Sequence, residues 1–185
     1  MNHSVCPVWI GHFLANPLRK LIHNPWKILF PYVKQGAKAV DIGSAMGFFS
    51  IPMAEIAGEK GNVICVDLQE EMLEALRKRA AKAGVESRLT LHKCSQNSLD
   101  LKQCNGEIDF ALIFAVAHEV PDKHRFFDEV SDLIKPGGKI LLAEPKGHVK
   151  QADFDGTVEA FEQRGFKVLF SPQIALSMAV MLEKE

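Results

Sequence analysis

From Ala37 to the end of the chain, short runs of apolar and β-branched residues alternate with segments of helical spacing. Alternation of this kind is typical of strand–helix–strand units, which build a parallel sheet with helices on both faces. The predicted strands are Lys38–Ile42, Asn62–Asp67, Arg88–Lys93, Ile108–Phe114, Lys139–Glu144, Lys167–Phe170 and Ser177–Leu182. The pattern therefore predicts an α/β fold.

Two helices stand out between these runs. The first has apolar residues at helical spacing, begins at Glu70 and ends at Gly84. The second is expected to begin at Pro121 and to end at Pro136-Gly137-Gly138. The connection around Ser171-Pro172 is too short for a parallel crossover, so the last strand should be antiparallel. We expect a seven-stranded, mostly parallel sheet whose last strand is reversed.

The first 36 residues differ from the rest, because prolines interrupt their amphipathic stretches. We expect two or three short helices there, which form an N-terminal helical cap over residues 1–36. The main domain is expected to span residues 37–185. A chain of 185 residues that is 47% hydrophobic can bury one sizeable core.

Charge and composition exclude several kinds of partner. The 22 basic and 23 acidic residues nearly cancel, so no overall field attracts nucleic acid or anionic lipid. No apolar run approaches the roughly 18 residues that span a bilayer, and no Lys or Arg precedes Arg19. We expect a cytoplasmic protein with reduced cysteines. We also expect no metal site, because His118 and His124 are six positions apart with Pro121 between them.

The segment after the first strand carries the strongest functional signal. Gly43 and Gly47 permit a tight turn that brings backbone N–H groups close to a ligand. Asp41 lies just before this turn, where it would repel a pyrophosphate and attract an ammonium group. Asp67 closes the second strand, where a carboxylate can accept both ribose hydroxyls of a nucleoside. Either acid alone could be an ordinary strand-ending residue, but together they predict a site for a positively charged amino-acid nucleoside.

This segment resembles the first motif of the class I S-adenosylmethionine-dependent methyltransferases, in particular the small-molecule branch related to ubiquinone/menaquinone methyltransferases. The resemblance rests on Asp41-Ile42-Gly43-Ser44-Ala45-Met46-Gly47, on Asp67, and on Leu133-Ile134-Lys135-Pro136-Gly137-Gly138. It covers roughly Ala37 to Glu185 and implies a Rossmann-like sheet. It also implies S-adenosyl-L-methionine as cofactor, S-adenosyl-L-homocysteine as product and a small-molecule methyl acceptor.

The resemblance also implies the cofactor-binding residues. These are Asp41, Gly43, Ser44, Ala45, Gly47, Asp67, Leu68, Cys94, Ser95 and Ala115. Leu68 is expected either on the adenine face or in the core. The family often has an Asp where this chain has Cys94-Ser95, so the Ser95 N–H or the Gln96 amide is expected to contact adenine. Ala45 replaces the middle glycine of the motif, and we expect a negative φ there.

His118 and Glu119 follow the fourth strand, where the family places residues that face the sulfonium and the incoming nucleophile. The methyl group is already activated, so its transfer needs mainly positioning and exclusion of water. For a hydroxyl or amine acceptor, His118 is the expected base and Glu119 the second choice. The alternative for His118 is a structural role beside the next helix.

The N-terminal segment concentrates aromatic and imidazole side chains, namely Trp9, His12, His23, Trp26 and Tyr32. They predict either an aromatic wall for a planar or cationic acceptor or helices anchored by core aromatics. Cys6 is either a reactive thiol near that wall or an isolated buried cysteine.

Two other functions are open to this sequence. An NAD(P)-dependent oxidoreductase would use the same sheet and Asp67, but the chain lacks a clean Gly-x-Gly-x-x-Gly turn and Asp41 is badly placed for it. A catalytically silent, S-adenosylmethionine-binding regulatory subunit would account for Ala45, for Cys94 and for the absence of an unambiguous base. The two outer glycines and the two acids favour the enzyme.

Overall fold

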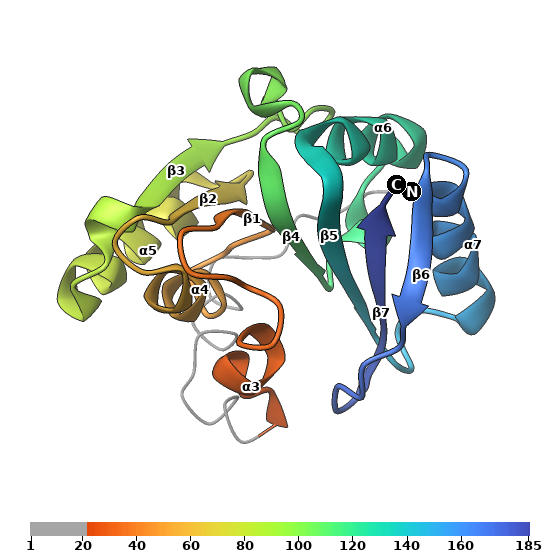
Figure 1. Ribbon diagram of the computed structural model, residues 1–185, viewed down its shortest axis with the longest axis horizontal. Helices are drawn as coiled ribbons and strands as arrows, with labels where there is room; N and C mark the ends of the chain where they lie inside the picture. The colour runs from red at the N-terminus through yellow and green to blue at the C-terminus, as the bar shows by residue number, and fades with distance from the viewer. Residues whose placement is uncertain (1–21) are drawn as a thin grey trace. The chain divides into compact units, whose positions relative to one another are not determined.

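A computed structural model describes residues 22–185 of the chain (Figure 1). Cys6, Trp9 and His12, for which the sequence suggested roles, lie outside the described residues. The described residues divide into two compact units, 22–94 and Ser95–Glu185.

In the first unit, residues 22–94 contain three parallel strands in the order β3-β2-β1. They are β1 (Lys38–Ile42), β2 (Asn62–Asp67) and β3 (Leu89–Lys93). The helices are α3 (Pro25–Leu29), α4 (Ser50–Ala57) and α5 (Glu70–Ala83), with a 3-10 turn at Glu86–Arg88. The interior positions of β1 and β2 are buried, as expected for strands with apolar residues on both faces.

Helix α5 shows how directly the sequence determines this unit. Its buried residues are Met72, Leu73, Leu76 and Ala80. They recur at helical spacing and form the face that packs on β2 and β3. Gly84 follows with a left-handed φ of 73°, a conformation that glycine adopts without steric cost, and it ends the helix. The predicted helix is confirmed.

The second unit, Ser95–Glu185, contains four strands in the order β4-β5-β7-β6. They are β4 (Ile108–Phe114), β5 (Ile134–Pro145), β6 (Phe166–Phe170) and β7 (Ser177–Lys184). Strand β4 pairs with β5 in parallel, whereas β7 runs antiparallel to both β5 and β6. The predicted reversal of the last strand is therefore confirmed.

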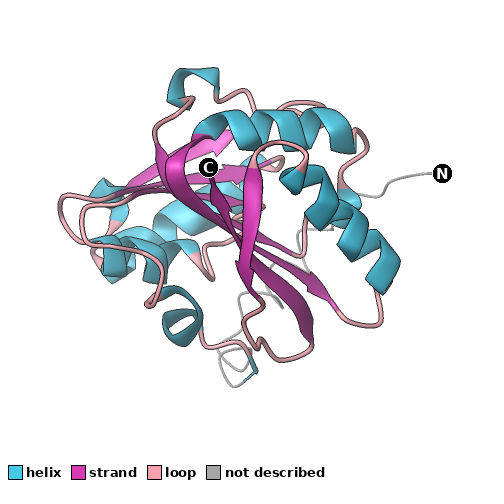
Figure 2. Ribbon diagram, turned by 45° about the vertical axis from the view of Figure 1, so that its right-hand side comes forward, coloured by secondary structure: helices cyan, strands magenta, loops and turns pink. Residues whose placement is uncertain are grey.

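Helices α6 (Lys123–Leu133) and α7 (Gln151–Glu162) pack beside each other against these strands (Figures 1 and 2). Two 3-10 turns, Lys102–Cys104 and Ala117–Glu119, complete the unit. The Phe161 ring lies 5.1 Å from the Phe127 ring and 5.6 Å from the Phe166 ring, measured between centroids. This aromatic cluster joins α6, α7 and β6 into one core.

Both predicted boundaries of the second helix are wrong. Helix α6 begins after Asp122, whose side chain accepts a hydrogen bond from the Arg125 N–H at 3.1 Å and caps the helix. It ends at Leu133 because Ile134 is already extended and pairs with Ile108 of β4. The Pro-Gly-Gly sequence therefore lies inside β5.

Helices α4 and α7 were not identified from the sequence. Helix α4 buries six of its eight residues, so it lacks the polar face that would make it recognisable. Helix α7 buries only Phe154, Thr157 and Phe161. None of the helices in residues 22–185 combines the length and apolar composition that crossing a bilayer requires.

Candidate functional site

The glycine loop between β1 and α4 is fixed to the end of β2. The backbone N–H groups of Gly43 and Ser44 both donate to the Val66 carbonyl oxygen at 2.9 Å. Gly47 has a φ of 79°, and a Cβ there would lie 2.8 Å from Cγ of Leu76. Glycine at position 47 is therefore required by the backbone and by the packing of α5.

Helix α5 also holds the loop through a charged side chain. The Arg79 guanidinium donates to the Met46 carbonyl oxygen at 2.7 Å. Burial lowers the pKa of Arg79. Arg79 lies three positions after Leu76, so both side chains are on the loop-facing side of α5. Arg79 was not predicted from the sequence, although this spacing marks it as a candidate.

Ala45 adopts a positive φ of 44°, so the expectation of a negative φ is wrong. The turn directs the Ala45 N–H to Oδ2 of Asp67, at 2.9 Å. A left-handed conformation costs a residue with a Cβ roughly 1–2 kcal/mol. The loop therefore tolerates strain at the position where the family motif has glycine.

Asp67 binds backbone N–H groups through both carboxylate oxygens. Oδ2 accepts from Ala45 and Oδ1 accepts from Gln69, each at 2.9 Å. Burial raises the pKa of Asp67 above its ordinary value, and these backbone hydrogen bonds oppose that rise. Each carboxylate oxygen can accept a second hydrogen bond. The geometry therefore suits an acid that also receives two hydroxyl groups of a ribose.

Asp41 and Ser44 add buried polar groups to the same loop. Asp41 is buried, and its Oδ2 accepts a hydrogen bond from the Ser50 hydroxyl. Within residues 22–185, Oγ of Ser44 is buried and has no hydrogen-bond partner. A buried unpaired hydroxyl costs about 1–3 kcal/mol, which a polar ligand would relieve. The loop thus fits a ligand with hydrogen-bonding groups, as a nucleoside amino acid has.

The remaining expected cofactor residues of this region are Leu68, Cys94 and Ser95. Leu68 is half-buried, and the Cys94 N–H donates to the Asp67 carbonyl oxygen at 3.0 Å. The Ser95 N–H donates to the Ser98 carbonyl oxygen at 3.1 Å, which occupies the group expected to contact adenine. Of the two expected adenine contacts, the exposed Gln96 amide is the one that remains.

In the second unit, the chain turns sharply where β4 ends. Ala115 has a φ of 59°, and its N–H donates to the Ala143 carbonyl oxygen of β5 at 2.8 Å. The 3-10 turn Ala117–Glu119 follows and carries both expected base candidates. The end of β4 therefore brings His118 alongside the end of β5.

His118 is held by Glu144 of β5, a residue that was not predicted from the sequence. Nδ1 of His118 lies 2.6 Å from Oε2 of Glu144, and the His118 backbone N–H donates to Oε1 at 3.3 Å. The Glu144 side chain is 2% exposed and that of His118 is 18% exposed. The hydrogen bond to Glu144 raises the pKa of His118, while burial opposes the rise.

Two further residues flank the imidazole. The rings of His118 and His148 meet edge to face, with their centroids 4.9 Å apart. Oε1 of the half-exposed Glu119 lies 3.9 Å from Nε2 of His118. Glu144 sits near the end of its strand, as Asp41 and Asp67 do in theirs, and this pattern could have revealed it.

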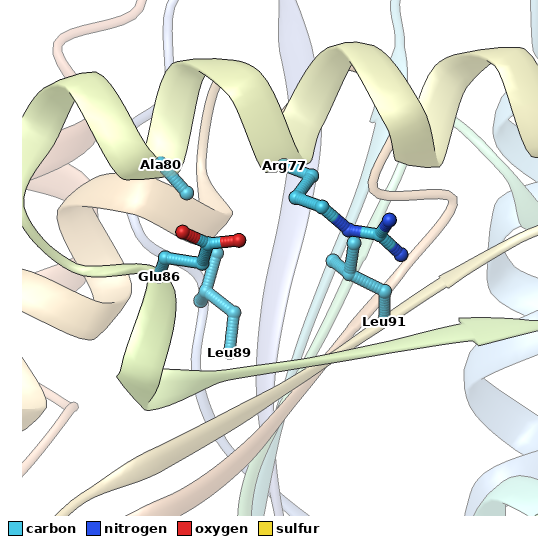
Figure 3. Close-up of a pocket in the computed structure, with 5 residues that line it drawn as sticks. All are labelled: Arg77, Ala80, Glu86, Leu89 and Leu91. Atoms are coloured by element: carbon cyan, nitrogen blue, oxygen red, sulfur yellow. The ribbon is translucent and has the colours of Figure 1, made fainter.

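Other features lie apart from these residues. A cavity of about 220 Å³ between α5 and β3 is lined by Arg77, Ala80, Glu86, Leu89 and Leu91 (Figure 3). It includes none of the expected site residues. In the described part of the chain, no group of three or more His, Cys, Asp or Glu side chains is arranged to hold a metal ion. Trp26 is exposed and therefore does not anchor α3 in a core.

Residues 33–174 match the family described as a methyltransferase domain. A demethylmenaquinone methyltransferase of Bacillus cereus is 30% identical over 125 residues, which are 66% of this chain and 52% of that protein. A ubiquinone/menaquinone biosynthesis C-methyltransferase of Haemophilus ducreyi is 29% identical over 126 residues, 66% of this chain and 48% of that protein. The chain spans about half the length of the curated relatives it matches.

The fold also matches that of a solved methyltransferase structure. The crystal structure of an S-adenosylmethionine-dependent methyltransferase from Aquifex aeolicus superposes with a TM-score of 0.85 at 21% identity. The match covers 98% of this chain and all of that one, which confirms the Rossmann-like fold with its mostly parallel strands. Because the family model matches residues 33–174, this chain belongs to the methyltransferase domain family.

Proposed function

We propose that the protein transfers a methyl group from S-adenosylmethionine to a small-molecule acceptor. The observation that carries the proposal is the loop fixed around Asp67. The Ala45 and Gln69 N–H groups orient both carboxylate oxygens of Asp67. They leave its remaining lone pairs for a nucleoside diol.

Three residues would hold the cofactor in this proposal. Asp67 would accept the ribose hydroxyls, and the buried Asp41 would supply negative charge toward the ammonium and sulfonium groups. The unpartnered Ser44 hydroxyl would gain a hydrogen bond to a polar group of the ligand. Leu68, Cys94 and Ala115 stay as predicted contacts.

The same loop argues against a dinucleotide. A pyrophosphate binds the free N–H groups of a glycine loop and is stabilised by positive potential there. Here the N–H groups of Gly43 and Ser44 donate to Val66, and that of Ala45 donates to Asp67. The loop therefore offers carboxylates where a diphosphate needs donors, which disfavours the oxidoreductase.

For chemistry, the bound cofactor supplies an electrophilic methyl group. An acceptor that carries an acidic hydrogen must lose it during transfer, and His118 would accept that proton. The relatives from Bacillus cereus and Haemophilus ducreyi bear names that refer to quinones. We therefore propose a hydroxylated aromatic ring, such as the reduced form of a quinone, as the class of acceptor.

Two measurements test the proposal. In calorimetry, S-adenosylmethionine and S-adenosylhomocysteine should bind, whereas NAD should not. In a transfer assay with labelled methyl donor, 1,4-naphthohydroquinone should take up label and an aliphatic amine of similar size should not. Failure of both nucleosides to bind would refute the proposal. Binding without label in hydroquinones, in fractionated metabolites, in RNA or in protein would instead identify a catalytically silent subunit.

A further inference from the structure

We propose that Glu144 is a positioning residue that fixes the proton of His118 on Nδ1 and leaves Nε2 as the proton acceptor of the reaction. The inference rests on the proposed function for its chemistry, because the proton comes from the methyl acceptor. The geometry on which it stands is independent of any ligand.

The two carboxylate oxygens of Glu144 lie within hydrogen-bonding distance of two nitrogen atoms of His118. Oε1 accepts from the His118 backbone N–H at 3.3 Å, and Oε2 lies 2.6 Å from Nδ1 of the ring. An ionised carboxylate can only accept hydrogen bonds, so Nδ1 must carry a hydrogen. In the neutral imidazole the free lone pair is then on Nε2.

Further contacts hold the ring in place. The rings of His148 and His118 pack edge to face, with 74° between their planes. The main-chain hydrogen bond from His118 to Glu144 ties the backbone of the 3-10 turn to the same carboxylate that holds the ring. The imidazole is thus anchored through backbone and side chain together.

Besides Glu144, two charged residues act on His118, and His148 contacts its ring. Glu119 faces Nε2 at 3.9 Å and raises the pKa of the ring, while Lys123 at the start of α6 lowers it. His148 packs against the ring as a second imidazole. Glu144 alone combines near-complete burial with direct contact to Nδ1. It is therefore the carboxylate that determines the tautomer.

A purely structural role explains this arrangement poorly. Burying a carboxylate costs several kcal/mol unless it is paired, and apolar residues of similar volume are often as stable. His118, the other member of the pair, is accessible to solvent, because 18% of its side-chain surface is exposed. A buried acid behind a partly exposed imidazole matches the arrangement in which a carboxylate orients a histidine that acts as general base.

Loss of a proton from the acceptor accompanies the transfer of the methyl group. The acceptor's acidic X–H bond breaks, and the proton goes to Nε2 of His118. The electron pair that this releases in the acceptor forms the bond to the methyl carbon, whose bond to sulfur breaks with its electron pair left on sulfur. The positive charge of the sulfonium is replaced by that of an imidazolium, which Glu144 stabilises, and the proton then passes to water.

The Glu144→Gln variant provides the sharpest test. The His118 N–H requires an acceptor, so the Gln carbonyl must face it and the Gln NH₂ must face Nδ1. This exchange moves the ring proton to Nε2. Imidazole ¹⁵N NMR, with the His118 signals assigned by their loss in His118→Gln, should show an Nδ1–H tautomer in the wild type and an Nε2–H tautomer in Glu144→Gln.

Kinetics supply the second readout. With 1,4-naphthohydroquinone as acceptor, Glu144→Gln should lower kcat/KM at least about 100-fold. It should also move the acid limb of the pH profile to lower pH, because a negative charge beside the imidazole is lost. Glu144→Asp should regain part of the rate. Glu119→Gln, which removes the half-exposed carboxylate, should leave the tautomer unchanged.

Each outcome separates this inference from the proposed function. An Nε2–H tautomer in the wild type would overturn the inference even if Glu144→Gln failed to fold. An unchanged tautomer in a folded Glu144→Gln protein, or an unchanged kcat/KM, would also overturn it. An Nδ1–H tautomer in a wild-type protein that binds no S-adenosylmethionine would support the geometry and refute only the proposed function.

Discussion

The backbone N–H of Ala45 donates to Oδ2 of Asp67 across 2.9 Å, and this bond joins the glycine loop to the end of β2. The direction of that N–H depends on the left-handed φ of Ala45. Backbone strain at position 45 and orientation of the Asp67 carboxylate are therefore two aspects of one conformation.

Replacing Ala45 by glycine should stabilise the protein. Relief of the left-handed strain, roughly 1–2 kcal/mol, outweighs the chain entropy of glycine, roughly 0.5–1 kcal/mol. We expect the free energy of unfolding in urea to rise by about 0.5–1 kcal/mol. Ala54→Gly, in the interior of α4, should lower it instead. Equal losses in the two variants would contradict the role of strain.

Asp67→Asn should weaken the binding of S-adenosylmethionine. Both Asp67 oxygens accept backbone N–H groups, so the Asn NH₂ would confront either the Ala45 or the Gln69 donor. The loss of charge-assisted bonds at about 1.5–3 kcal/mol each predicts at least tenfold weaker binding by calorimetry. Asp155→Asn, on the exposed side of α7, is the control. Unchanged affinity in Asp67→Asn would remove this residue from the cofactor site.

Arg79→Met should loosen the glycine loop without touching its sequence. The variant loses the 2.7 Å hydrogen bond to the Met46 carbonyl oxygen but keeps much of the apolar stem. We expect about 1 kcal/mol less stability and weaker cofactor binding. Arg77→Met lies on the same helix and loses a surface ion pair with Glu74, so it should change neither. Identical effects in both variants would argue against a role for Arg79 in holding the loop.

The pH dependence of stability should report the pair of His118 and Glu144. The pKa of His118 is raised in the folded state, so its contribution is fully present below the unfolded value of about 6.5. That contribution is lost as the pH rises through the raised pKa. The free energy of unfolding of the wild type, minus that of His118→Gln, should therefore fall across this window. A constant difference would show that the imidazole titrates alike in both states.

The strands of this protein were largely predictable because their apolar runs are long and their ends are marked by polar residues. Asp41 and Asp67 could be singled out for the same reason, since each lies at or near the end of such a run. The reversal of β7 followed from the short connection that precedes it. These features depend on residues that are close together in the sequence.

What the sequence did not predict depends on distant partners. The role of Glu144 depends on its hydrogen bond with His118, 26 positions earlier. The role of Arg79 depends on its hydrogen bond to the Met46 carbonyl oxygen, 33 positions earlier. The φ of Ala45 likewise depends on Asp67, 22 positions later. The early end of α6 reflects the pairing of Ile134 with Ile108 of β4, which overrides the local stop signal of Pro136-Gly137-Gly138.

The placement of Glu144 inside the pairing of β5 with β7, opposite Met178, has an evolutionary consequence. A lineage that lost the imidazole of His118 would keep a buried carboxylate with only the backbone N–H of residue 118 as its hydrogen-bond donor, which is destabilising. Natural variants of this chain should therefore gain or lose the two residues together, and a homologue with only one of them should be rare.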